Sequence, residues 1–234
     1  MYRTLNPQKT IETIDKLGKR IHERFPTAGL NKVCAELLTL AQENQTQANW
    51  ISRPNIAIRL GVVLVIVLAA FVLIYSLSQL SFTREQFTIG DLVTVSEAGI
   101  NDIVLLGAAI FFLITLETRI KRSRALAALH ELRSIAHVID MHQLTKDPSH
   151  MLNKVVMTPS SPERVLTAFE LTRYLNYCSE MLSLTGKLAA LYAQDFRDAV
   201  VLSAVNEVEI LTTGLSRKVW QKIMILREMQ DLPS

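Results

Sequence analysis

The chain has 234 residues, of which 49% are hydrophobic and 20% charged, and its formal net charge is +3. The basic residues are spread along the chain instead of forming one long block, which argues against nucleic acid as a partner. With only 8 glycines and no Walker loop, GxGxxG fingerprint or nucleophile elbow, the sequence also argues against an enzyme that binds nucleotides through a glycine-rich loop.

The N-terminal region predicts a pair of helices. Residues 7–24 place isoleucine and leucine at helical spacing, with Asn6 as the cap and Pro7 in the first turn. Pro26 ends this helix, and a second helix is expected over about 30–47. A polar linker, 44–55, should follow, with Trp50 as an aromatic anchor at a membrane interface. We therefore expect residues 1–52 to form a cytosolic helical pair.

Two uncharged apolar runs, 60–77 and 103–116, decide the class of the protein. A helix needs about 20 apolar residues to cross a hydrocarbon layer roughly 30 Å thick. With their flanks, the two runs predict membrane helices over about 56–80 and 98–118, joined by an external loop, 81–97. The second domain, 53–118, is thus expected to be a two-pass transmembrane hairpin in contact with the lipid bilayer.

Charge placement predicts the orientation of this hairpin, because cytosolic flanks are enriched in Lys and Arg. The flanks carry Arg53, Arg59, Arg119, Lys121, Arg122 and Arg124. The region between the apolar cores carries Arg84 against Glu85, Asp91, Glu97 and Asp102. Both termini are therefore expected in the cytosol, with the protein in the plasma membrane, or in the inner membrane of a bacterium. The first apolar run begins too late and is too long for a signal peptide.

The third predicted domain, 119–234, should be a cytosolic bundle of long helices over about 119–143, 163–192 and 195–229. The helix that begins in the membrane is expected to continue without a break to about 143. Ser160 and Glu163 fit a capping box with Pro162 in the first turn, so we expect the next helix to begin there. No segment of useful length has the alternation of a strand, and the predicted fold class is all-α.

The last predicted helix carries an apolar seam with alternating spacings of four and three, typical of coiled coils. Its members are Val201, Val205, Val208, Thr212, Leu215, Val219 and Leu226, with Lys222 interrupting it. One interpretation is antiparallel packing against the helix at 163–192, which a short connection favours. The other is self-association between subunits, and we predict a homo-oligomer assembled through the helical regions.

Histidines gather in one segment, where His130, Arg133, His137 and Asp140 share a helix face. Imidazoles with a carboxylate predict a divalent metal site at His130, His137 and Asp140, or a sensor of pH. The alternative is a solvated polar stripe, since the spacing matches no specific zinc pattern. No other cofactor is expected. Cys34 and Cys178 lie in apolar helical patterns and are expected to be buried, reduced thiols.

Polar residues near the membrane ends add a second hypothesis. Asn101 and Asp102 lie at the outer end of the second membrane helix and Glu117 at its inner end, either as interfacial residues or as the lining of a pore between subunits. The leading functional hypothesis is a non-enzymatic membrane protein whose hairpin tethers a cytosolic helical assembly or sensing domain, with room for a protein partner. The alternatives are a homo-oligomeric ion channel or transporter gated by the cytosolic helices, and a metal-dependent membrane enzyme.

Overall fold

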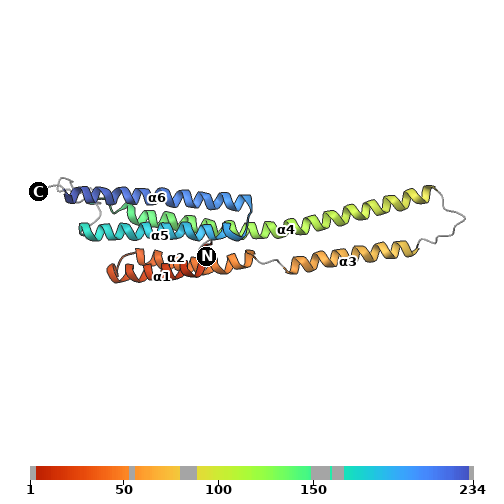
Figure 1. Ribbon diagram of the computed structural model, residues 1–234, viewed down its shortest axis with the longest axis horizontal. Helices are drawn as coiled ribbons and strands as arrows, with labels where there is room; N and C mark the ends of the chain where they lie inside the picture. The colour runs from red at the N-terminus through yellow and green to blue at the C-terminus, as the bar shows by residue number, and fades with distance from the viewer. Residues whose placement is uncertain (1–3, 53–55, 80–88, 149–158, 160–165, 232–234) are drawn as a thin grey trace. The chain divides into compact units, whose positions relative to one another are not determined.

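The computed structural model describes residues 4–52, 56–79, 89–148, 159 and 166–231. These residues form six helices and no strand, which confirms the all-α prediction for the described part of the chain (Figure 1). The helices are α1 (Pro7–Arg24), α2 (Leu30–Ser52), α3 (Ile56–Gln79), α4 (Ile89–Leu144), α5 (Ala168–Asp195) and α6 (Ala199–Asp231).

The chain divides into two compact units. The first unit combines residues 1–52 with 124–234, and the second consists of 53–123. The sequence led us to treat 1–52 and 119–234 as separate domains, whereas the structure joins them through contacts of α1 and α2 with α5. Because α4 runs through both units, its 56 residues include the second apolar run and the histidine segment in one helix.

The α1–α2 pair begins as its sequence predicts. The Asn6 side chain accepts a hydrogen bond from the Lys9 amide at 3.2 Å and caps α1. Isoleucines and leucines of α1 point into the core, and Phe25 follows the helix with its ring edge-on to Tyr174 of α5, 5.5 Å between centroids. In the tight turn that follows, Asn31 Nδ2 donates to the Phe25 carbonyl at 2.6 Å, which gives this carbonyl at the helix end a donor.

The predicted polar linker is helical up to Ser52, which corrects the expected end of α2 near residue 47. Its first residue, Asn44, is buried and accepts a 2.6 Å hydrogen bond from the Tyr192 hydroxyl of α5. Trp50 is half-buried against the core, and the Arg124 guanidinium lies 4.0 Å from its ring centroid. Asn44 and Trp50 thus tie this segment to the rest of the unit.

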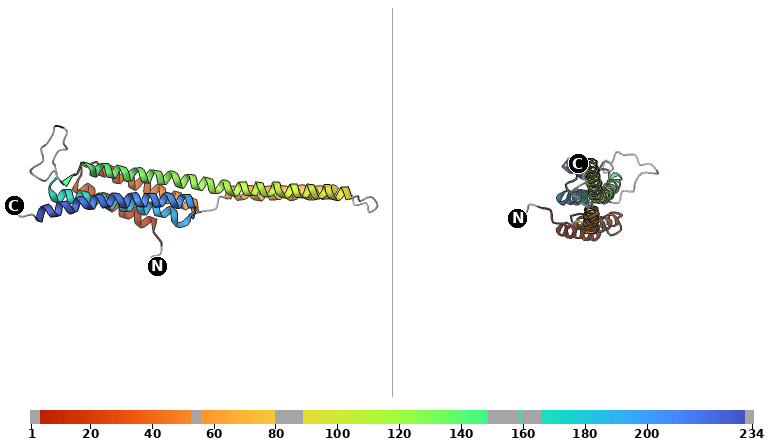
Figure 2. Two further views of the ribbon diagram at one scale, coloured as in Figure 1. Left: turned by 90° about the horizontal axis from the view of Figure 1, so that it is seen from above. Right: turned by 90° about the vertical axis from the view of Figure 1, so that its right-hand side faces the viewer.

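Helices α5 and α6 form a hairpin and lie side by side in both longitudinal views (Figures 1 and 2). A capping box of Thr167 and Glu170 begins α5 at Ala168. The box predicted at Ser160 and Glu163 lies outside the described residues. Asp198 begins α6, because its carboxylate accepts from the Val200 and Val201 amides at 3.1 and 3.2 Å.

Length and composition alone would let two of the described helices cross a membrane. One is the part of α4 from Gly99, whose most apolar window has a mean hydropathy of 2.1 with none of the window buried. The other is Ala199–Met229 of α6, with a mean hydropathy of 1.2 and part of its window buried. In α3, Ile56–Val72 meets the apolar criterion over a shorter length.

Candidate functional site

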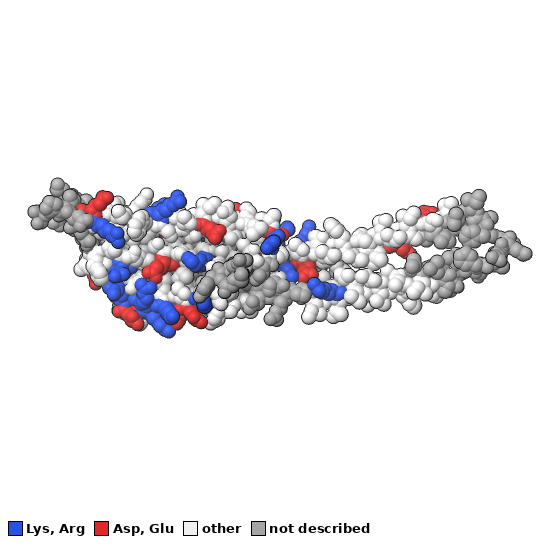
Figure 3. Space-filling view, in the orientation of Figure 1, with Lys and Arg blue, Asp and Glu red and all other residues white. Residues whose placement is uncertain are grey.

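The described helices of the second unit expose many large apolar side chains. In α3 and in the first part of α4, large hydrophobic side chains are exposed that a water-soluble fold would bury, among them Phe71 at 68%, Ile103 at 71% and Phe111 at 72%. The sequences 60–79 and 103–116 contain no charged residue. Figure 3 shows the same contrast, with charged side chains crowded on the first unit and sparse on the second.

The polar residues predicted near the membrane ends lie at the margins of this apolar surface. Asn101 and Asp102 are exposed side chains of α4. Glu117 is half-buried and forms an ion pair with Lys121 one turn later, 2.9 Å from Lys121 Nζ to Glu117 Oε1. This pairing neutralises a carboxylate that would be costly near hydrocarbon, so Glu117 needs no pore to explain its position.

The structure describes the candidate metal ligands His130, His137 and Asp140 as side chains along one face of α4. His130 and His137 are exposed, and half-buried Asp140 accepts a hydrogen bond from Gln143 Nε2. Arg133 of the same stripe reaches Glu207 of α6 across 3.3 Å. Within the described ranges, His, Cys, Asp and Glu side chains do not gather in any group of three that could hold a metal ion. The geometry therefore favours a polar stripe over the metal interpretation.

The apolar seam of α6 is occupied within the chain. All seven seam residues are buried, and α6 packs against α5. This is the antiparallel arrangement, the first of the two interpretations, and it leaves the seam closed to a second subunit. A homo-oligomer would have to use other surfaces.

Lys222, which interrupts the seam, has a defined role that the sequence did not reveal. Its ammonium donates a 2.7 Å hydrogen bond to the Gln143 carbonyl in the last turn of α4, where carbonyls lack helical partners. Burial lowers the pKa of Lys222, and the nearby Asp147 and Asp140 oppose that shift. The one sign of this contact in the sequence was that a lysine, Lys222, lies between the apolar seam residues Val219 and Leu226.

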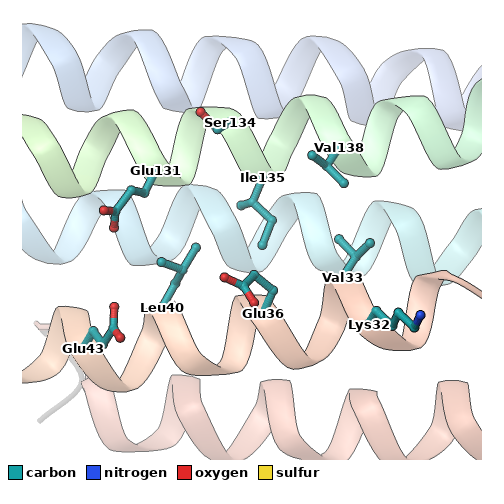
Figure 4. A pocket seen from close by; sticks show the side chains of 9 residues that line it. All are labelled: Lys32, Val33, Glu36, Leu40, Glu43, Glu131, Ser134, Ile135 and Val138. Carbon is teal, nitrogen blue, oxygen red and sulfur yellow. The ribbon is translucent and has the colours of Figure 1, made fainter.

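A groove of about 600 Å³ opens between α2 and α4 (Figure 4). Apolar side chains form its floor: Val33, Leu40, Ile135 and Val138. Glu36, Glu43 and Glu131 line it with carboxylates from both helices, and Lys32 and Ser134 complete it. A surface of this kind suits an apolar ligand of positive charge, and none of these side chains forms a nucleophile with an adjacent base.

The two cysteines are buried, as predicted, and neither forms a disulfide. Burial is the main cause that raises the pKa of Cys34 to about 11 and that of Cys178 to about 12. Burial likewise raises the pKa of the Tyr174 and Tyr192 hydroxyls above the ordinary range. These groups stay protonated near neutral pH and are suited to packing instead of chemistry.

Comparison of the chain with models of protein families, with curated proteins and with solved structures finds no match. Its function must therefore be argued from the surfaces described above.

Proposed function

We propose that the protein is an integral membrane protein, anchored by a hairpin of α3 and the first part of α4, whose helical bundle is a non-enzymatic assembly or sensing domain in the cytosol. The observation that carries the proposal is the exposed apolar surface of the second unit. Transfer of each exposed leucine or phenylalanine of that surface from water into lipid is favourable, by about 25 cal/mol per Å² of apolar area.

The lengths of the helices support this anchor. With 24 residues, α3 is about 36 Å long, enough to cross a hydrocarbon layer of roughly 30 Å. In α4 the uncharged run 103–116 is about 21 Å long, so the helix crosses the layer only with its flanks included, Asp102 and Glu117 lying in the interfacial regions. An α-helix also satisfies its backbone hydrogen bonds within the segment, which is required in lipid because no water is present to form them.

The packing of α6 argues against α6 as a membrane helix, although its composition would permit one. Its seam is already buried against α5, and the opposite face carries charged residues such as Arg217 and Lys218. Insertion of α6 into lipid would separate it from α5 and bring these charges into hydrocarbon, at a cost of several kcal/mol. We therefore assign α6 to the bundle.

The role of the bundle is inferred from the groups on its surface. Carboxylates line the α2–α4 groove, and exposed apolar side chains such as Ile210 and Trp220 lie on the outer face of α6. Such surfaces suit binding, either of a protein partner or of a second copy of the chain. The mass of the purified protein in mild detergent, measured by light scattering, would separate a monomer from a homo-oligomer.

Extraction of membranes with alkaline carbonate tests the anchor. The wild-type protein is expected to stay with the membrane pellet, as is an Ile210→Arg variant altered on the outer face of α6. Two charges placed in α3 by Leu64→Arg and Leu68→Arg are expected to reduce membrane insertion, since each costs about 2.5–3.5 kcal/mol near the centre of a membrane helix. Release of the wild-type protein into the supernatant would overturn the proposal.

A further inference from the structure

A second hollow, of about 500 Å³, lies between α1 and α5 on the bundle. Its lining combines three arginines with one aromatic ring and one carboxylate: Arg20, Arg24, Arg173, Tyr177 and Glu23. Figure 3 shows Lys and Arg side chains gathered over this part of the bundle, with acidic side chains among them. The volume falls in the range of about 300–1,000 Å³ that is typical of small-molecule sites.

One of the three arginines is held by a partner. Arg20 binds Glu180 with both terminal nitrogens, Nη1 to Oε2 at 2.9 Å and Nη2 to Oε1 at 3.4 Å. Its guanidinium also lies over Tyr177, with Cζ 5.3 Å from the ring centroid. The carboxylate of Glu180 therefore compensates the charge of Arg20, which lines the hollow without being available to a ligand.

The other two arginines share a contact with one aromatic ring and lack the bidentate carboxylate pair that Arg20 has. Arg24 of α1 and Arg173 of α5 each place Cζ 5.5 Å from the ring centroid of Phe169. A cation–π contact attracts the guanidinium to the ring and takes up none of its N–H donors. Within the described part of the chain, neither arginine has a carboxylate at ion-pair distance.

Phe169 itself supports a functional interpretation. Phe169 is 56% exposed, so it contributes little to the hydrophobic core and its place at the surface needs another explanation. Its contacts with both guanidiniums bring two cations from different helices to one place. Glu23 lines the hollow with a carboxylate. Hydrogen bonds from Thr167 lower the pKa of Glu170, and Arg24 lies near enough to lower it further. Arginines still outnumber carboxylates in the lining itself.

We propose that this hollow binds a phosphate-bearing anion through Arg24 and Arg173. The planar fork of a guanidinium matches the oxygens of a phosphoryl group and donates two parallel hydrogen bonds to it. Two forks from α1 and α5 can bind one ligand with two phosphoryl groups or a phosphate ester. The same chemistry occurs in free phosphate compounds and in phospholipid headgroups. This inference concerns the bundle alone and stands or falls independently of the membrane anchor.

Calorimetric titration of the full-length protein in mild detergent, with pyrophosphate as the ligand at constant ionic strength, tests the proposal. The variant Arg24→Gln/Arg173→Gln is expected to bind at least tenfold more weakly than the wild type. The control Arg217→Gln/Lys218→Gln removes two exposed positive charges from α6 and is expected to bind as the wild type does. Equal weakening in both variants would show unspecific attraction between charges and would overturn the proposal.

A second titration, with dihexanoyl phosphatidic acid below its micellar concentration, distinguishes the two sources of the ligand. Tighter binding of pyrophosphate identifies a free phosphate compound, and tighter binding of the lipid identifies a headgroup. Both results support the site only if Arg24→Gln/Arg173→Gln weakens the binding at least tenfold. The absence of binding of either compound to the wild type would refute the proposal.

The conservative variant Arg173→Lys guards against a folding defect. It keeps the positive charge but loses the planar fork, and its side chain is exposed, so its melting temperature is expected to equal that of the wild type. An intermediate loss of affinity would support recognition by the fork. Unchanged affinity would show that only charge matters, and the assignment to paired guanidiniums would be wrong.

Discussion

Thr212 of α6 lies opposite Gly186 of α5, so close that a Cβ atom added at Gly186 would lie 3.0 Å from Thr212 Oγ1. The threonine is buried, and its hydroxyl donates to the Val208 carbonyl at 3.0 Å, which holds the side chain in this position. The small residue on one helix and the short polar residue on the other let the two backbones approach. The one polar member of the seam, Thr212, is thus part of the packing.

The first prediction follows from this contact. Gly186→Leu is expected to lower the free energy of unfolding by about 1–3 kcal/mol, because a larger side chain must displace Thr212 or separate the helices. The matched control is Gly214→Ala on α6, where an added Cβ meets nothing within 4 Å. It should raise stability by up to about 1 kcal/mol through helix propensity. Chemical denaturation followed by circular dichroism measures both, and a fully stable Gly186→Leu variant would disprove the close approach.

The second prediction tests the seam itself. Val208 is 2% exposed, so Val208→Asp would place an unpaired carboxylate in the core and is expected to cost several kcal/mol. Ile210→Asp changes a neighbouring side chain that is 63% exposed, and should shift stability by less than about 0.5 kcal/mol. Similar melting curves for Val208→Asp and Ile210→Asp would contradict the burial of the seam.

The helices were predictable where local signals and burial agree. Asn6 with Pro7 and the apolar spacing of the next residues gave α1, which spans Pro7–Arg24. The absence of a helix-breaking residue before Pro148 predicted that the helix after the second apolar run would be long, as α4 is. Local signals failed at Asn44, where polar composition suggested a linker, because its stabilising partner, Tyr192, lies 148 residues away.

The candidate sites were harder to predict for the same reason. Lys222 and Gln143 meet only when α6 lies against the end of α4. Arg24 and Arg173 converge on Phe169 from helices that are distant in the sequence. Asp198 is buried and caps α6. In each case the chemistry of one residue was visible in the sequence, but its partner was set by tertiary packing.

The third prediction concerns pH. The His142 ring packs on the α1–α2 turn, where a Cβ added at Gly29 would lie 2.7 Å from His142 Cε1. Burial lowers the pKa of His142, and the nearby Lys146 lowers it further. Because the unfolded chain then takes up a proton more readily than the folded one, stability should fall as the pH drops through about 6.5.

Thermal unfolding at pH 7.5 and pH 5.5 measures this effect. The wild type is expected to melt at a lower temperature at the acidic pH, and His142→Gln, which cannot be protonated, should show a smaller difference. The exposed His137 provides the control, since His137→Gln should keep the difference of the wild type. If His142→Gln and the wild type lose the same stability, another group is responsible.

The fourth prediction concerns the thiols. A thiolate is the reactive form of cysteine, and the raised pKa values of Cys34 and Cys178, about 11 and about 12, leave almost none of it near pH 7.5. Neither thiol is expected to react with a maleimide in the folded protein, whereas both should react in denaturant. An added cysteine at the exposed Ser203 provides the positive control. Rapid labelling of the folded wild type would show that the bundle opens or packs differently.

The last prediction concerns topology, and the protected native thiols make it simple to test. A Ser96→Cys variant carries its new thiol on an exposed position in the segment that the charge pattern places outside the cell. It is expected to react with a membrane-impermeant maleimide in intact cells. Ser234→Cys, at the last residue of the chain, should react only after the cells are permeabilised. Labelling of Ser234→Cys in intact cells, without labelling of Ser96→Cys, would mean that the hairpin is inserted in the opposite sense. Protection of both until permeabilisation would mean that the segment between the apolar runs does not cross the membrane.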